Sequence, residues 1–205
     1  MADVDEVVPL AGRLRLTVVR GTLTPAQLRA YAAMHPRPEG SSTAALRAVT
    51  GREEPVREER AGSNVVTTVG YTTLAASMVW SGVQDLAAEL GLTSPNYLTP
   101  LYGAVGSGAG TPAKADVQLF TELGRVTVGA GASSPATPSI SAYATWLFYF
   151  PSPATTWTVT EAGLFANATS AANSGAMLNH WAFSPTVSVP TSDTLLLQMS
   201  LLLGP

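Results

Sequence analysis

The stretch that decides the fold is residues 157–165, which read Trp-Thr-Val-Thr-Glu-Ala-Gly-Leu-Phe. Trp157, Val159 and Glu161 alternate with threonines, so an extended strand would place them on one face. Tryptophan, valine and threonine also favour a pleated, half-buried surface. Gly163 interrupts the alternation and predicts either a bulge or a close approach of two backbones. We therefore expect a β-strand that carries a single carboxylate.

Glu161 is the unusual residue of this strand, because a buried carboxylate without partners is energetically expensive. The structural interpretation is that Glu161 accepts backbone N–H bonds and fixes a corner of the fold, together with Gly163 and Phe165. The chemical interpretation is a general acid or base, but no partner for that role is visible in the sequence. We favour the structural interpretation and predict no catalytic residue.

The composition is unusually poor in charge. The chain has 205 residues, enough to bury a substantial core, and 46% of them are apolar but only 12% charged. A typical globular domain is about 25% charged. Such a chain either buries much of its surface or presents a weakly charged surface to neighbouring subunits, as in an assembly.

Several classes of function are disfavoured by composition. The chain has no cysteine, which excludes disulfides and thiolate metal sites, and its two histidines, His35 and His180, are far apart. The net charge of −3 argues against a nucleic-acid binder. The acidic N-terminus is unlike a signal peptide, and no apolar run reaches the roughly 20 residues of a membrane-spanning helix. We therefore predict no cofactor, metal, nucleic acid or membrane partner.

Charge is concentrated at the start of the chain, because nine of the 11 basic residues precede Gly62. This shift predicts two parts: a charged N-terminal arm at residues 1–62 with one strand and a short helix, and a β-rich core domain at residues 63–205. In the strand expected at residues 13–19, apolar side chains alternate with arginines, which predicts one buried and one wet face. The charged run at residues 52–60 predicts a solvated surface or an arm that orders on a neighbouring subunit.

Local signals place the remaining elements. Thr24 predicts the N-cap of a helix over residues 25–34, and helical spacing continues over residues 71–91. The strand at 157–165 is expected to return antiparallel beside the strand at 139–150. The last strand is apolar on both faces, which predicts a central place in the sheet or a subunit interface. Strands are expected at residues 13–19, 97–105, 125–128, 139–150, 157–165, 176–183, 185–189 and 194–203.

These elements predict a mainly β fold. Seven or eight mostly antiparallel strands at this spacing are typical of an antiparallel β-sandwich or a small barrel. Two or three short helices are expected in the N-terminal half. The glycine-rich stretch at residues 106–112 does not match a phosphate-binding loop, because no Gly-Lys-Ser/Thr and no long helix follow it. The Gly/Ser/Pro-rich stretch at residues 129–138 is expected to be a loop.

Short motifs in the second half resemble a family of virion structural proteins of tailed bacteriophages. The most diagnostic is Thr-Glu-Ala-Gly-Leu-Phe at residues 160–165, which is similar to signatures of phage tail-collar and fibre proteins. This sequence departs from the pattern of that family most at residues 21–61, where it has a longer charged insert. The other motifs, in chain order, are Asn-Val-Val-Thr-Thr-Val-Gly at 64–70, Gly-Ser-Gly-Ala-Gly-Thr-Pro at 106–112, Asp116, Leu119, Glu122-Leu123, Gly-Ala-Met-Leu at 175–178 and Phe-Ser-Pro at 183–185.

The resemblance implies a non-enzymatic subunit of a virion, assembled in the host cytoplasm. We expect a capsid decoration or cement protein that contacts the major capsid protein, or tail and connector subunits, and that self-associates with cyclic symmetry such as a trimer. Candidate interface residues come from the charged segment and from the aromatic strands. They are Arg13, Arg15, Arg52, Arg57, Arg60, Trp146, Tyr149, Trp157, His180 and Trp181.

Two alternatives remain open from the sequence. The first is a tail, collar or fibre protein for attachment, in which aromatic rings bind a receptor or glycan by stacking; at strand positions such rings more often belong to a core. The second is an enzyme, although no nucleophile elbow, metal motif or close carboxylate pair is present. Glycan binding by the isolated protein would favour the first alternative, and hydrolase activity lost on Glu161→Gln would favour the second.

Overall fold

A computed structural model describes residues 10–34, 41–70, 72, 101–135 and 142–203. The fold is mainly β, as predicted, and two helices lie near its start. Thr68 to Gly70 and Thr72 are helical as well. The elements are β1 (Leu10–Val19), α1 (Pro25–Ala33), α2 (Thr43–Thr50), β2 (Val56–Val66), β3 (Tyr102–Gly106), β4 (Glu122–Thr127), β5 (Ala130–Pro135), β6 (Ala142–Phe150), β7 (Trp157–Ala166), β8 (Ala176–Val189) and β9 (Thr194–Leu203).

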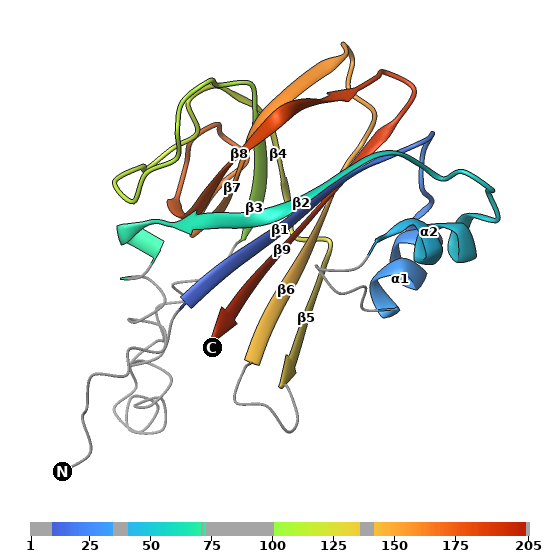
Figure 1. The fold of residues 1–205 in the computed structure, drawn as a ribbon, viewed down its shortest axis with the longest axis horizontal. Coiled ribbons are helices and arrows are strands. Elements are labelled where there is room, and N and C mark those ends of the chain that lie inside the picture. The colour runs from blue at the N-terminus through green and yellow to red at the C-terminus, as the bar shows by residue number, and fades with distance from the viewer. Residues whose placement is uncertain (1–9, 35–40, 71, 73–100, 136–141, 204–205) are drawn as a thin grey trace.

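The strands form two antiparallel sheets that are linked through β2 (Figure 1). We call β2-β1-β9-β6-β5 the five-strand sheet and β8-β7-β3-β4 the four-strand sheet. β2 pairs with β1 from Val56 to Asn64, and its last two residues pair with β8. Among the described strands, the end strands β4 and β5 do not pair with each other. The arrangement is therefore the predicted sandwich and not a closed barrel.

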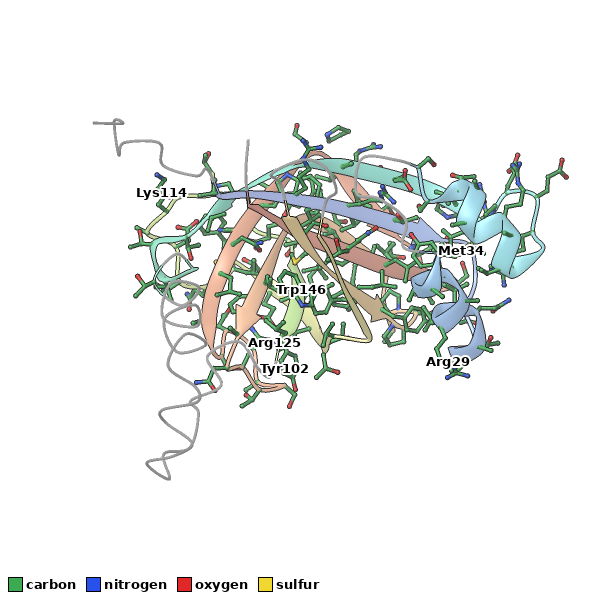
Figure 2. The ribbon with its side chains drawn as sticks, turned by 90° about the horizontal axis from the view of Figure 1, so that it is seen from below. Arg29, Met34, Tyr102, Lys114, Arg125 and Trp146 are labelled. Atoms are coloured by element: carbon green, nitrogen blue, oxygen red, sulfur yellow. The ribbon has the colours of Figure 1, made fainter. Side chains whose placement is uncertain are left out.

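The main hydrophobic core lies between the two sheets. Alternate residues of β1, β6 and β9 enter it, which is the period-2 pattern of a sheet with one buried face. Figure 2 shows Trp146 of β6 among the strands, where it packs against this core. Its buried members include Leu14, Leu16, Val18, Phe148, Phe150, Val159, Leu164, Leu178, Val187, Val189, Leu195, Leu197 and Met199.

The predicted alternation of β7 breaks at Thr160. The pairing register of β7 with β8 shifts between Val159 and Glu161, and both Val159 and Ala162 face the main core. A bulge of this kind turns the following side chains to the opposite face. The prediction that Glu161 shares a face with Trp157 and Val159 is therefore wrong, because the bulge moves the carboxylate out of the apolar core.

The predicted pairing of the strands at 139–150 and 157–165 is also wrong. β6 pairs with β9 and β5, whereas β7 pairs with β3 and β8. The connection between β6 and β7 crosses from one sheet to the other, so the two strands face each other across the core. There Phe150 and Trp157 meet edge to face with ring centroids 6.3 Å apart. β9 lies between β1 and β6, which confirms its predicted central position.

Helices α1 and α2 pack on the outer face of the five-strand sheet, at one end of the molecule (Figure 1). Thr24 caps α1 as predicted, and its hydroxyl and the Gln27 side chain form a reciprocal capping box. Because Tyr31 and Leu46 of the two helices cover this face, Arg15 is only 1% exposed. The wet face predicted for β1 is thus wrong at Arg15.

The boundary that we expected near residue 62 falls inside β2. β1 and β2 occupy the middle of the strand order, so the described part of residues 1–62 is built into the sandwich. The second half of the charged run at residues 52–60 forms the start of β2, and the loop expected at residues 129–138 contains β5. Most of the helix predicted at residues 71–91 lies outside the described residues.

Candidate functional site

The candidate site is built around a 15-residue connection on the outer face of the four-strand sheet. Residues 107–121, which we call the strap, connect β3 to β4 and contain most of the glycine-rich stretch. Leu119 of the strap is fully buried in a small outer cluster with Phe165, Met177 and Ala104. The strap therefore covers the face of β7 that the bulge at Thr160 has turned outward.

The Glu161 carboxylate is fully buried beneath the strap and accepts backbone hydrogen bonds from both of its ends. Its Oε1 accepts from Gly108 N–H at 2.9 Å and from Thr121 N–H at 2.8 Å. Its Oε2 accepts from Phe120 N–H at 2.9 Å. Hydrogen bonds to an ionised acceptor are stronger than neutral ones. This is the backbone-acceptor role that we assigned to Glu161 from the sequence.

His180 of β8 completes the network. Its Nε2 lies 2.9 Å from Glu161 Oε2, its Nδ1 lies 2.7 Å from Asp116 Oδ2, and the ring is fully buried. Asp116 belongs to the strap and also accepts from Ala113 N–H at 2.8 Å. A neutral imidazole donates to one of the two carboxylates, and an imidazolium donates to both. In either state His180 links the sheet to the strap.

Two glycines allow the strap to approach Glu161 closely. A Cβ on Gly106 would lie 2.4 Å from the Thr121 carbonyl oxygen, and one on Gly108 would lie 2.5 Å from Glu161 Oε1. Neither distance is compatible with a real side chain. The Thr160 hydroxyl adds a bond of 2.6 Å to the Gly108 carbonyl. The glycine-rich stretch thus serves close packing around a carboxylate.

Phe120 forms the outer layer of the site. Its ring centroid is 4.9 Å from that of His180, and a Cβ on Gly110 would lie 2.3 Å from the Phe120 ring. Phe120 is 44% exposed, whereas the Glu161 and His180 side chains beneath it are not exposed at all. The aromatic ring therefore separates a buried charged group from solvent.

The hydrogen-bonding atoms of Glu161 and His180 are engaged in bonds within the chain. A carboxylate offers about four lone-pair positions, and Glu161 has four partners. Both nitrogens of His180 face a carboxylate oxygen, so neither faces a nucleophile as in a catalytic triad. No group of three or more metal-ligating side chains suited to a metal ion occurs in the described ranges. The arrangement is suited to holding the strap.

The sequence reasoning missed the partners of Glu161. Gly163 pairs directly with His180 in the β7–β8 ladder, which brings the imidazole next to Glu161. The polar segment between these two strands is typical of a hairpin turn, and pairing the strands on that basis could have placed His180 near Glu161. Gly163 itself is closely packed, since a Cβ there would lie 3.2 Å from Leu119 Cδ2 and 3.2 Å from the Asn179 carbonyl oxygen. This supports the close-approach option for Gly163.

The predicted interface arginines are mostly engaged within the chain. Arg15 Nη1 donates to Gln198 Oε1 at 3.4 Å, and Arg52 donates to the carbonyls of Arg20 and Thr22. Arg57 and Arg60 form ion pairs with Asp193 and Glu58, respectively. Arg13 is exposed on β1.

Tyr31 lies close to Arg15 beneath the helices. Burial raises the pKa of the Tyr31 phenol, although the Arg15 guanidinium and the Ser42 hydroxyl beside it act in the opposite direction. A raised phenol pKa means that the neutral, hydrogen-bonding form is favoured in the folded protein. The five-strand sheet thus buries one cation among polar side chains, with the Glu59 carboxylate in the same cluster.

The predicted aromatic interface residues also contact this chain's own interior. Trp146, Trp157 and Trp181 are partly buried against the main core. Tyr149 packs under α1, where its hydroxyl accepts from Leu23 N–H at 3.3 Å. His180 is buried in the network described above. The rings considered for glycan stacking are therefore not gathered on one open face of the described structure.

A small pocket lies between α1 and β6, at the helical end of the molecule. It has a volume of about 290 Å³ and is largely apolar. Figure 2 shows Arg29 at this end and Lys114 of the strap at the opposite end. The pocket is lined by Pro25, Leu28, Arg29, Ala32, Gly129, Leu147 and Tyr149.

The search for membrane-spanning helices and the comparisons with known proteins gave no match. No helix within the described ranges has the length and apolar character needed to cross a membrane. No protein-family model, no curated protein and no solved structure matches the sequence or the fold.

Proposed function

We propose that this chain is a non-enzymatic structural subunit of a tailed-bacteriophage virion, and specifically a capsid decoration or cement protein. The observation that carries the proposal is the convergence of its family-like motifs. The glycine-rich stretch, Asp116 and Leu119 lie in the strap, and they contact Glu161, Phe165 and Met177 of the two motifs in β7 and β8. Stretches far apart in the sequence thus form one structural unit.

The geometry of this unit supports a structural role. Glu161 and His180 are buried, and their polar atoms face the strap and the sheet. A catalytic group must reach a substrate directly or through one water, and here Phe120 covers the pair. The network is therefore better suited to fixing a loop on a sheet than to proton transfer.

The weak charge of the chain supports packing against other subunits. Only 12% of the residues are charged, and several arginines are engaged in bonds within the chain. Among the described residues, the large apolar side chains that stay exposed are Met34, Val117 and Phe120. Two of them belong to the strap, which makes its outer face the candidate contact with a neighbouring subunit. Closed cyclic self-association is expected.

Locating the protein in purified particles tests the proposal. Particles from infected cells are analysed by mass spectrometry and by cryo-electron microscopy, and the fold is fitted to the density. We expect density on the capsid surface at or near symmetry axes. Density confined to the tail tip would instead favour an attachment protein, and absence from particles would overturn the proposal.

A variant series connects that result to the strap. Val117→Asp places a charge on an exposed side chain that is 58% accessible, so the fold should tolerate it. We expect the variant to remain folded and to lose incorporation into particles at least about tenfold. Thr127→Asp, at an exposed position of β4, is the matched control. Equal incorporation of both variants would contradict the role assigned to the outer face of the strap.

A further inference from the structure

We propose that the strap is a lid held by a single latch, the Glu161 carboxylate, and that it opens and closes as one unit. Opening would uncover Glu161 and His180 and would displace Val117 and Phe120, which are the exposed apolar side chains of the strap. The proposal is independent of the virion role, because it rests only on the contacts within the chain.

The first argument is that one side chain holds both ends of the loop. Gly108 and Thr121 donate to the same oxygen, Glu161 Oε1, at 2.9 Å and 2.8 Å. The Phe120 amide donates to the other oxygen. If the carboxylate withdraws, all three amides lose their acceptor together. Independent opening of either end would leave a buried anion with a missing partner, which is unfavourable.

The second argument is that the remaining bonds tie the ends of the strap to each other and to the sheet. Ser107 N–H donates to the Thr121 carbonyl at 2.8 Å, and the Thr160 hydroxyl donates to the Gly108 carbonyl. In the middle of the strap, Asp116 reaches His180, and Thr68 N–H donates to the Lys114 carbonyl at 2.8 Å. The Lys114 anchor lies at the surface, whereas Asp116 meets the buried His180 and Leu119 packs in the small outer cluster. These contacts reinforce the latch in the middle of the strap, and Glu161 alone holds both of its ends.

The third argument is the position of Phe120 on the latch. Its amide is one of the three latched groups, and its ring covers His180 at a centroid distance of 4.9 Å. The residue that covers His180 is therefore also one of the residues that the latch holds, so release of the latch frees both its amide and its ring. A covered carboxylate also forms stronger hydrogen bonds, because water is excluded from them.

Hydrogen exchange followed by NMR tests the proposal on the full chain. In the wild-type protein we expect the amides of Gly108, Phe120 and Thr121 to share one opening equilibrium, more frequent than that of Leu16 in central β1. In Glu161→Gln we expect the exchange of these three amides to accelerate together, by one common factor of at least about 100. In Phe120→Ala the Gly108 and Thr121 amides should accelerate together by about tenfold.

Controls keep the experiment decisive. Val117→Ala truncates another exposed apolar side chain of the strap and should leave the three exchange rates within about twofold of wild type. If Glu161→Gln does not fold, the test uses the wild-type protein at increasing denaturant concentration. The free energy of opening should then fall with denaturant at the same slope for all three amides, because they open as one cooperative unit. Different slopes, or acceleration of one amide without the others in Phe120→Ala, would overturn the proposal.

Discussion

The outer faces of the two sheets are covered in opposite ways. On the five-strand sheet, two helices cover a buried cation, Arg15, which meets the side chains of Gln198 and Tyr31. On the four-strand sheet, an irregular strap covers a buried anion, Glu161, which meets three backbone amides. One face is thus held by side chains on regular elements, and the other by main-chain groups of a loop.

The difference teaches where a buried charge is indispensable. A helix forms its own backbone ladder, so the main-chain bonds inside α1 and α2 do not depend on Arg15. The strap has no such internal ladder, and buried amides without acceptors are costly. Its amides depend on Glu161, and three of the four partners of that carboxylate are main-chain groups. We therefore expect the anion to matter more than the cation.

The largest expected effect is that of Glu161→Gln on global stability. The amide group retains the size of the side chain but replaces one acceptor oxygen with a donor that faces N–H groups. We expect the free energy of unfolding to fall by about 3 kcal/mol or more, measured by urea denaturation. Glu54→Gln, at an exposed position, should change it by less than about 0.5 kcal/mol. Similar values for the two variants would remove the contrast between buried anion and surface.

A second effect of similar origin is expected at Gly106. Gly106→Ala would bring a Cβ to 2.4 Å from a backbone oxygen, so the strap or β3 must shift. We expect a loss of about 2–3 kcal/mol in urea denaturation. Gly129→Ala is the matched control, because its nearest neighbour would be at 3.7 Å, and it should be tolerated. Equal tolerance of both would mean that the strap is less closely packed than its contacts indicate.

Arg15→Met tests the other side of the comparison. Methionine fills a similar volume, and the neighbouring Gln198 and Tyr31 can reorient. The Glu59 carboxylate of the same cluster keeps its hydrogen bonds from Thr17 and Ser42. We expect a loss of about 1–2 kcal/mol, smaller than that of Glu161→Gln. A larger loss than at Glu161 would reverse the ranking of the two faces.

The smallest expected effect is an acid-dependent one at Asp193, which links the β8–β9 turn to β2. Burial alone would raise the pKa of the Asp193 carboxyl, but hydrogen bonds from Arg57, Ser192 and Gly21 N–H outweigh it and hold the pKa below its ordinary value. The ionised form is therefore favoured in the folded state. Its contribution is present above the ordinary pKa and is lost as the pH falls through the folded one.

We expect this contribution to be less than about 1 kcal/mol, because the Arg57 side chain is 39% exposed and the pair is screened. Stability measured between pH 6 and roughly pH 3 should fall less steeply in Asp193→Asn than in the wild type. An identical pH dependence in both proteins would assign no role to this carboxyl.

Much of the fold could be predicted from local features of the sequence. Thr24 before Pro25 specified the start of α1, and the apolar pattern of residues 194–203 specified a central strand. Strand partners could not be read in the same way. The composition of the segment between Phe150 and Trp157 does not distinguish a turn within one sheet from a crossover to the other sheet, and the crossover is what occurs.

The candidate site was predicted in part, for a physical reason. A lone carboxylate in an apolar strand requires donors, so its structural role could be inferred from Glu161 alone. The identity of the donors depends on the bulge at Thr160 and on the register of β7 with β8, which are properties of the assembled sheet. Arg15 was misassigned for a similar reason, since alternation does not reveal that helices will cover the second face.

The passage of β2 through both sheets has a mechanical consequence. In a sandwich whose layers meet only through side chains, the layers can slide apart by shearing the apolar interior. Here Val65 and Val66 bond to β8 while the preceding residues bond to β1, so the same peptide backbone belongs to both layers. Tension applied to one layer reaches the other along a covalent strand, and separation requires that its ladder be unzipped.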